Sequence, residues 1–127
     1  MSRVILDASA LLAFMNGEPG GDAVPAATGE AAISAVNLAE VVSVLTAQGM
    51  SEELVREQLD QLVLDVRDFG RPAAFETGLM VAKTRSLGLS LGDRACLASA
   101  RQEGIPALTS DRSWANVDVG VTVQLIR

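Results

Sequence analysis

Short apolar runs of strand length alternate along this chain with longer segments of helical pattern. The runs expected to form strands are residues 3–7, 31–34, 64–69 and 105–109, with a last edge strand within residues 119–126. Strands separated by helices require right-handed crossovers, which build a mostly parallel sheet with helices on both faces. The pattern therefore predicts an α/β fold, and the length of 127 residues fits a single domain over residues 1–127.

Capping residues, proline and glycine give the expected boundaries of the helices. In chain order, we expect a first helix capped by Ser9, a weak one over residues 21–28, one beginning at Asn37, one opening at Ser51, one from Pro72 to near Gly88, and one over residues 93–103. A short turn or helix near the C-terminal end holds Trp114, for which we expect packing rather than stacking on a base.

Four carboxylates fall where a strand or loop gives way to a helix, namely Asp7, Glu40, Asp93 and Asp111. In an open α/β fold such junctions gather along one edge of the sheet, where ligands bind. Each acid alone has a simpler explanation as a helix cap, and the spacings from Asn37 to Glu40 and from Ser90 to Asp93 resemble capping boxes. Asp7 is harder to explain in this way, because it closes an apolar strand with no Lys or Arg beside it in sequence.

Acids gathered in one place repel one another unless a cation lies between them, so the four together predict a site for a hard divalent metal. Mg²⁺ and Mn²⁺ prefer oxygen ligands, polarise phosphoryl oxygens and increase the acidity of water. Histidine is absent, which excludes Ser-His-Asp and Cys-His catalysis and His-ligated zinc. The residues therefore favour phosphodiester hydrolysis that depends on Mg²⁺ or Mn²⁺.

Charge is distributed unevenly along the chain, whose formal net charge is −6. Residues 51–68 carry six acids and two arginines, a net of −4, and we expect them to form a solvated face. Residues 83–112 carry five basic and three acidic side chains, a net of +2. The overall sign argues mildly against nucleic-acid binding but does not exclude an anionic substrate.

The single cysteine, Cys96, lies in an apolar helical stretch and is expected to be a buried core residue. It has no partner for an internal disulfide, which suits a reducing compartment. Asp7 interrupts the apolar N-terminal run, and no uncharged stretch reaches the ~18 residues of a membrane helix. We therefore expect a soluble cytoplasmic protein that does not associate with a membrane.

Four segments resemble motifs of the PIN-domain nucleases, with the greatest likeness to the VapC-type toxins of toxin–antitoxin modules. The segments are Val-Ile-Leu-Asp-Ala-Ser-Ala-Leu-Leu-Ala at residues 4–13, Ser-Ala-Val-Asn-Leu-Ala-Glu-Val-Val at 34–42, Leu-Ser-Leu-Gly-Asp-Arg-Ala-Cys-Leu-Ala at 89–98, and Ala-Leu-Thr-Ser-Asp-Arg-Ser-Trp at 107–114. The resemblance implies a three-layer α/β/α PIN-like fold and a Mg²⁺- or Mn²⁺-dependent endoribonuclease. It also implies a homodimer inhibited by a VapB-type antitoxin.

The resemblance assigns roles to the acids and to two hydroxyl groups. Asp7 and Asp93 look like the main metal ligands, and Asp111 looks like a direct or water-mediated one. Glu40 resembles an acid that binds metal or orients the attacking water. The hydroxyls of Ser9 and Ser110 match small positions beside the acids that hold an acid or a phosphate in place.

Two arginines, Arg94 and Arg112, lie next to site acids in the sequence. Contact with the RNA backbone and a local surface ion pair explain them equally well. Two other functions stay open, namely a housekeeping PIN nuclease in RNA processing and a catalytically silent binding module that takes no metal. A phosphoacceptor receiver domain is disfavoured, because the only lysine, Lys83, falls inside an expected helix.

Overall fold

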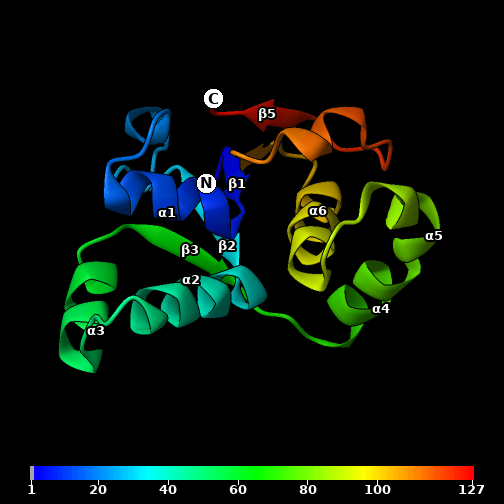
Figure 1. Cartoon of the computed structure of the whole chain (residues 1–127). Coiled ribbons are helices and arrows are strands. Elements are labelled where there is room, and N and C mark those ends of the chain that lie inside the picture. Colours follow the sequence, from blue (N-terminus) through cyan, green and yellow to red (C-terminus); the bar gives the residue numbers. More distant parts are fainter. Residues whose placement is uncertain (1) are drawn as a thin grey trace.

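A five-stranded parallel sheet forms the centre of the computed structural model, which describes residues 2–127 (Figure 1). Its strands are β1 (Val4–Leu6), β2 (Ala31–Ser34), β3 (Leu64–Arg67), β4 (Ala107–Thr109) and β5 (Val123–Leu125). They lie in the order β3-β2-β1-β4-β5, and every neighbouring pair is parallel. The predicted α/β class is confirmed, and the sheet is wholly rather than mostly parallel.

Helices cover both faces of this sheet, which confirms the three layers. On one side lie α1 (Ala8–Asn16), α2 (Ala35–Ala47) and α3 (Glu52–Asp60), and on the other α4 (Arg71–Leu79), α5 (Val81–Thr84) and α6 (Leu91–Glu103) (Figure 1). Short 3₁₀ helices follow at η1 (Gly21–Ala23), η2 (Arg85–Leu87) and η3 (Arg112–Asn116). No helix within residues 2–127 is both long enough and apolar enough to cross a bilayer.

The apolar core divides into two clusters, one on each face of the sheet. Leu6 of β1 belongs to the cluster under α1 and α2, whereas its neighbour Ile5 belongs to the cluster under α6, as expected from the alternation of side chains along a strand. Trp114 and Cys96 are fully buried in this second cluster, which confirms the packing role predicted for each. Burial raises the pKa of the Cys96 thiol well above its ordinary value.

The caps of two helices lie earlier than the sequence predicts, and α6 begins at Leu91 rather than at residue 93. Asp7 rather than Ser9 caps α1, because the strand passes into the helix with no intervening loop and the Asp7 carboxylate accepts the Ala10 N–H. Ser34 rather than Asn37 caps α2, since its hydroxyl already accepts the Val36 N–H. The expected capping box over residues 37–40 is therefore wrong.

The caps of two other helices are confirmed. Ser51 caps α3, and Ser90 closes a capping box with Asp93 at the start of α6. The six acids of the negatively charged segment are all exposed, which confirms a solvated face; they are Glu52, Glu53, Glu57, Asp60, Asp65 and Asp68.

Two expected helices are interrupted. Residues 21–28 form only the short η1, since Pro25 lacks the N–H that a continuing helix needs. The long helix expected from Pro72 to Gly88 is broken at Met80 into α4 and α5 and then tightens into η2. Gly78, a weak helix former, precedes this break, and the Thr84 hydroxyl donates to the Met80 carbonyl beyond it.

The strand order places a topological switch point between β1 and β4. From β1 the chain moves outward through β2 to β3, and then returns to the other side of β1 for β4 and β5. The Asp7 N–H donates to the Leu108 carbonyl at 3.1 Å, which joins the carboxyl ends of the two strands. In open α/β sheets, ligands bind beside the carboxyl ends of strands at such a point.

A loop glycine after α1 allows the segment that follows β5 to lie close against it. Gly20 has a φ of +83°, and a Cβ atom added there would stand 2.1 Å from the Ile126 carbonyl oxygen. The Ile126 N–H donates to the Thr109 carbonyl at 3.0 Å, so this segment also continues the pairing with β4. The loop thus supports the strand end that carries Thr109.

We predict that Gly20→Ala destabilises the fold by about 3 kcal/mol, because it adds a backbone clash to the strain of a left-handed conformation. Gly17→Ala is the matched control, since Gly17 also has a positive φ but nothing within 4 Å of the added Cβ. It should cost only about 1 kcal/mol. Urea unfolding of both variants measures the difference, and equal losses would contradict the close approach.

Candidate active site

Asp7 is a buried carboxylate at the carboxyl end of the central strand, and it is only 4% exposed. Its Oδ1 accepts the Ala10 N–H at 2.8 Å and the Ser9 hydroxyl at 2.7 Å. Its Oδ2 accepts the Thr109 hydroxyl at 2.5 Å. Both oxygens are therefore fixed, one by the first turn of α1 and the other by the last residue of β4.

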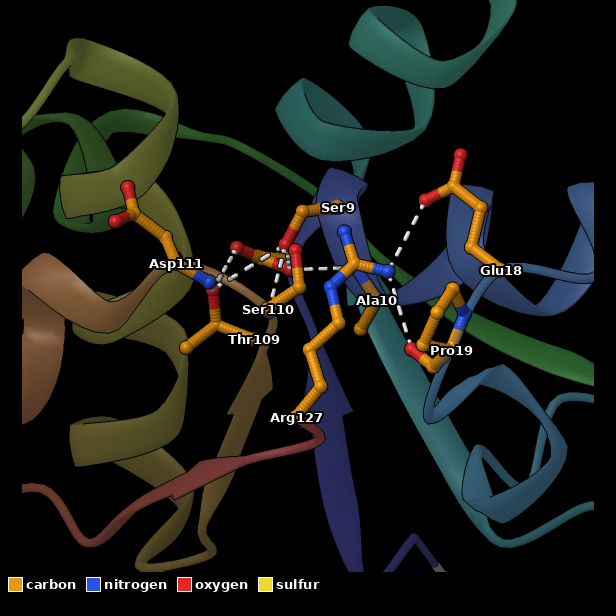
Figure 2. Close-up of polar contacts among 9 residues, drawn as sticks. Ser9, Ala10, Glu18, Pro19, Thr109, Ser110, Asp111 and Arg127 are labelled. Atoms are coloured by element: carbon orange, nitrogen blue, oxygen red, sulfur yellow. Dashed lines mark hydrogen bonds and ion pairs between the residues drawn. The ribbon is translucent and has the colours of Figure 1, made fainter.

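The same hydroxyl groups hold the turn after β4 against the start of α1. Thr109 Oγ1 accepts the Asp111 N–H at 3.0 Å, and Ser9 Oγ accepts the Ser110 N–H at 2.9 Å. Figure 2 shows Ser9, Thr109 and Ser110 brought together from these two elements. The Ser110 hydroxyl makes no hydrogen bond within residues 2–127, whereas its backbone does. Thr109, the last residue of β4, rather than Ser110 supplies the hydroxyl that donates to Asp7.

The other three acids each use one carboxylate oxygen in a local hydrogen bond. Asp93 Oδ2 accepts the Ser90 N–H at 2.9 Å, and Asp111 Oδ1 accepts the Ser113 N–H at 2.9 Å. Glu40 Oε1 accepts the Asn37 side-chain N–H at 2.8 Å. The second oxygen of each acid has no hydrogen bond within the described part of the chain. Capping thus explains Asp93 and Asp111 without preventing a further role.

All four acids line one cavity of about 240 Å³ at the switch point. Its other lining residues include Ser9 and Asn37. The carboxylates come from the end of β1, from α2, from the start of α6 and from the turn after β4. Residues far apart in the sequence therefore meet in one concave, acidic site.

Burial raises the pKa of Asp7 from its ordinary value of 3.8 to about 6, because desolvation disfavours the charged form. Hydrogen bonds from Thr109, Ala10 and Ser9 lower the pKa in part, and the negative charge of Asp93 raises it further. The site therefore holds negative charge at a free-energy cost that a nearby cation would reduce.

The two arginines differ in their surroundings. Arg94 is half-buried, and its Nη1 donates to the Thr77 carbonyl at 3.0 Å, which ties α6 to α4. Arg112 is exposed and forms no ion pair within residues 2–127. Of these two side chains, Arg112 is thus the one that is exposed and without an ion pair in the described part of the chain.

Residues 4–120 match the family model of the PIN domain. The chain belongs to the PIN domain family. This match confirms the resemblance drawn from the four sequence motifs. No curated protein sequence matches the chain.

Solved structures with the PIN fold resemble this chain over nearly its whole length. DNA-bound VapBC from Salmonella typhimurium matches with a TM-score of 0.73 and 19% identity, covering 100% of both chains. A toxin–antitoxin complex from Klebsiella pneumoniae has a TM-score of 0.71 and 20% identity, covering 98% of both chains. VapC20 from Mycobacterium tuberculosis, a sarcin–ricin loop cleaving toxin, has a TM-score of 0.69 and 17% identity, covering 94% of this chain and 98% of its own. At these identities the matches establish a common fold.

The donor set of this PIN domain fits a hard divalent ion. The polar side chains that line the cavity all carry oxygen atoms, and the only side-chain nitrogen among them is that of the Asn37 amide. The free-energy cost of ionising Asp7 also favours a cation. Within residues 2–127, no three acids form a ready-made cluster of direct ligands. Mg²⁺ does not require one, since it commonly binds one or two carboxylates directly and retains several waters.

The raised pKa of Asp7 predicts how stability depends on pH in metal-free buffer. The native state retains this proton up to about pH 6 and the unfolded state only to 3.8. Stability due to Asp7 is therefore greatest below the unfolded pKa and is lost as pH rises through the folded pKa. Because Asp7→Asn removes this titration, its stability relative to wild type should rise by about 3 kcal/mol between about pH 3 and about pH 7.5.

Urea unfolding in EDTA at several pH values measures this difference. Asp60→Asn serves as a control, because it removes one carboxylate from an exposed position on α3. A difference between Asp7→Asn and wild type that does not change with pH would contradict the proposed cost of charging Asp7.

Proposed function

We propose that this PIN domain is a metal-dependent endoribonuclease that acts as the VapC-type toxin of a toxin–antitoxin pair. The observation that carries the proposal is the convergence of four acids on one cavity of about 240 Å³. Family membership supports nuclease chemistry, and the structural neighbours described as VapBC or toxin–antitoxin complexes support the toxin role.

The carboxylates divide into ion-holding and water-orienting groups. Asp7 and Asp93 would hold Mg²⁺ or Mn²⁺, and Asp111 would do so directly or through water. When bound, such an ion polarises a phosphoryl oxygen and makes water more acidic. Glu40 accepts a hydrogen bond from the attacking water and so orients it. Ser9 and Thr109 keep Asp7 fixed through their hydroxyl groups.

The phosphate groups of the RNA are the part of the substrate that would bind at this site. The exposed Arg112 follows Asp111 in the sequence and would contact the RNA backbone, since arginine suits phosphate recognition. Arg94, bonded to the Thr77 carbonyl of α4, would add positive charge without a direct contact to the RNA. The ribonuclease works in the cytoplasm as a homodimer, which sedimentation should show as twice the mass of one chain.

Two other functions make different predictions. A housekeeping PIN nuclease would cleave RNA without arresting growth when it is overproduced. A catalytically silent module would bind neither Mg²⁺ nor Mn²⁺ in a phosphate-free calorimetric titration. Growth arrest on expression, together with binding of Mn²⁺, separates the toxin from both alternatives.

We predict that Asp7→Asn and Asp93→Asn each abolish RNA cleavage while the fold survives, because each removes an ion-holding carboxylate. Cleavage by the wild type should stop in EDTA and return when excess Mg²⁺ or Mn²⁺ is added. A gel assay of RNA fragments with far-UV circular dichroism of each variant tests both statements. Glu53→Gln, on the exposed face of α3, is the control. Wild-type cleavage that persists in EDTA would refute the mechanism.

An apolar groove between α2, α3 and β3 supports the binding of an antitoxin. Its volume is about 740 Å³. Most of its lining side chains are aliphatic, and the charged ones are Glu52, Arg56 and Asp60 of α3. Because β3 lies at the edge of the sheet beside this groove, a partner segment with apolar residues and some basic ones would fit it.

We predict that Val66→Lys weakens binding of the antitoxin encoded beside this chain's gene by about 100-fold, since it places a charge in an apolar interface. Val63→Lys is the matched control, because Val63 is also exposed but does not line the groove. Both variants should cleave RNA at the wild-type rate. Calorimetry measures the affinities, and an unchanged affinity for Val66→Lys would exclude this groove as the antitoxin site.

A further inference from the structure

Glu40 lies against the first turn of α6, in space that Gly92 leaves free. A Cβ atom added to Gly92 would stand 2.0 Å from Glu40 Oε1 and 2.6 Å from its Cδ. Both distances are far shorter than van der Waals contact, so a larger residue at position 92 would displace this carboxylate. Asp93 follows Gly92 directly in the sequence, and both Glu40 and Asp93 line the cavity. The absence of a side chain at Gly92 therefore also determines how closely the Glu40 carboxylate can approach Asp93.

Asn37 also holds this carboxylate, by hydrogen bonding. Its Nδ2 donates to Glu40 Oε1 at 2.8 Å and to the Gly92 carbonyl at 2.9 Å. One side-chain amide thus joins α2 to α6 and fixes one oxygen of Glu40. Glu40 Oε2 has no hydrogen bond within residues 2–127 and is the oxygen left for water or substrate.

The chemistry of these contacts fixes which way the Asn37 amide points. Both partners are hydrogen-bond acceptors, so only the NH₂ group can face them. Asn37 Oδ1 is consequently buried without a partner in the part of the chain that the structure describes, in a residue that is 1% exposed. A buried unpaired oxygen costs free energy, and Asn is a weaker helix former than Ala. These two costs offset part of the stability that Asn37 gains by tying α2 to α6 through the Gly92 carbonyl.

We propose that Asn37 and Gly92 are positioning residues that together fix the Glu40 carboxylate for RNA hydrolysis. This inference rests on the proposed nuclease function and on the role assigned there to Glu40. Asn37 acts through its N–H donors, and Gly92 acts through the space it leaves. Neither residue touches the reacting atoms.

Gly92→Ala separates positioning from stability. Gly92 is the second residue of α6, where its φ is not positive and Ala is the better helix former. The atoms that the new methyl group meets belong to the end of a flexible side chain, which can move away. The variant should therefore fold as stably as wild type while Glu40 is displaced. Gly78→Ala in α4 is the control, since nothing lies within 4 Å of its added Cβ.

The deciding experiment is a double-mutant cycle on single-turnover cleavage of an RNA that the wild type cuts, at saturating Mg²⁺. Glu40→Gln and Glu40→Ala alone should each reduce the rate constant by roughly 100-fold or more, and Gly92→Ala and Asn37→Ala by roughly 30-fold each. Gly78→Ala should stay within about twofold of wild type. In a Glu40→Ala background, Gly92→Ala and Asn37→Ala should each change the rate by less than about threefold, because the carboxylate they position is gone.

Equal losses in both backgrounds, or a wild-type rate for Gly92→Ala, would overturn the inference. A crystal structure of Gly92→Ala gives a second readout that does not need activity. It should show Glu40 displaced and its contact with Asn37 lost, and an unmoved carboxylate would overturn the inference equally. A wild type that cleaves no RNA, or unchanged turnover in Glu40→Gln, would instead refute the proposed nuclease mechanism, and the crystal structure would still decide how Glu40 is held.

Discussion

The hydrogen bonds to the buried Asp7 carboxylate are the contacts on which the rest of the site depends. They link the end of β1 to the first turn of α1 and, through Thr109, to the end of β4. The same carboxylate is costly to charge, because it is buried and faces a second acid. One group therefore both holds the two sides of the switch point together and carries a cost of ionisation that a bound cation would reduce. Under the proposed mechanism, a substitution that removes this charge would stabilise the metal-free protein at neutral pH and abolish RNA cleavage, as is common where function and stability compete.

Helix capping and site formation are complementary in this protein. Asp7, Asp93 and Asp111 all accept backbone N–H groups at the start of a helix, and this orients their carboxylates. For Asp7 the hydroxyls of Ser9 and Thr109 add to this hold. Because a carboxylate has two oxygens, a cap can use one and leave the other free. Glu40 lies inside α2 instead, so a side chain and the space beside a glycine must hold it.

The sequence was most informative where a residue's neighbours along the chain decide its structure. The five strands and the three acids at helix starts, Asp7, Asp93 and Asp111, could be predicted in this way, whereas Glu40, predicted at a junction, lies inside α2. Ser9 was mistaken for the cap of α1 because the strand was expected to end before the helix rather than pass directly into it. Thr109 was missed because threonine in an apolar strand resembles any β-branched residue; its contact with Asp7 follows from the pairing of Leu6 with Leu108. The Arg94 contact with Thr77 likewise depends on helix packing across 17 residues.

The burial of Cys96 has a practical consequence for spectroscopy. The thiol is inaccessible in the core, its pKa is raised, and it is the only cysteine in the chain. Thiol reagents act on exposed thiolates, so the folded protein should remain unlabelled. A cysteine introduced on the rim of the groove or of the acidic cavity would then be the sole attachment point for a fluorophore or spin label. Distance changes on partner binding could be followed in this way without first altering the core.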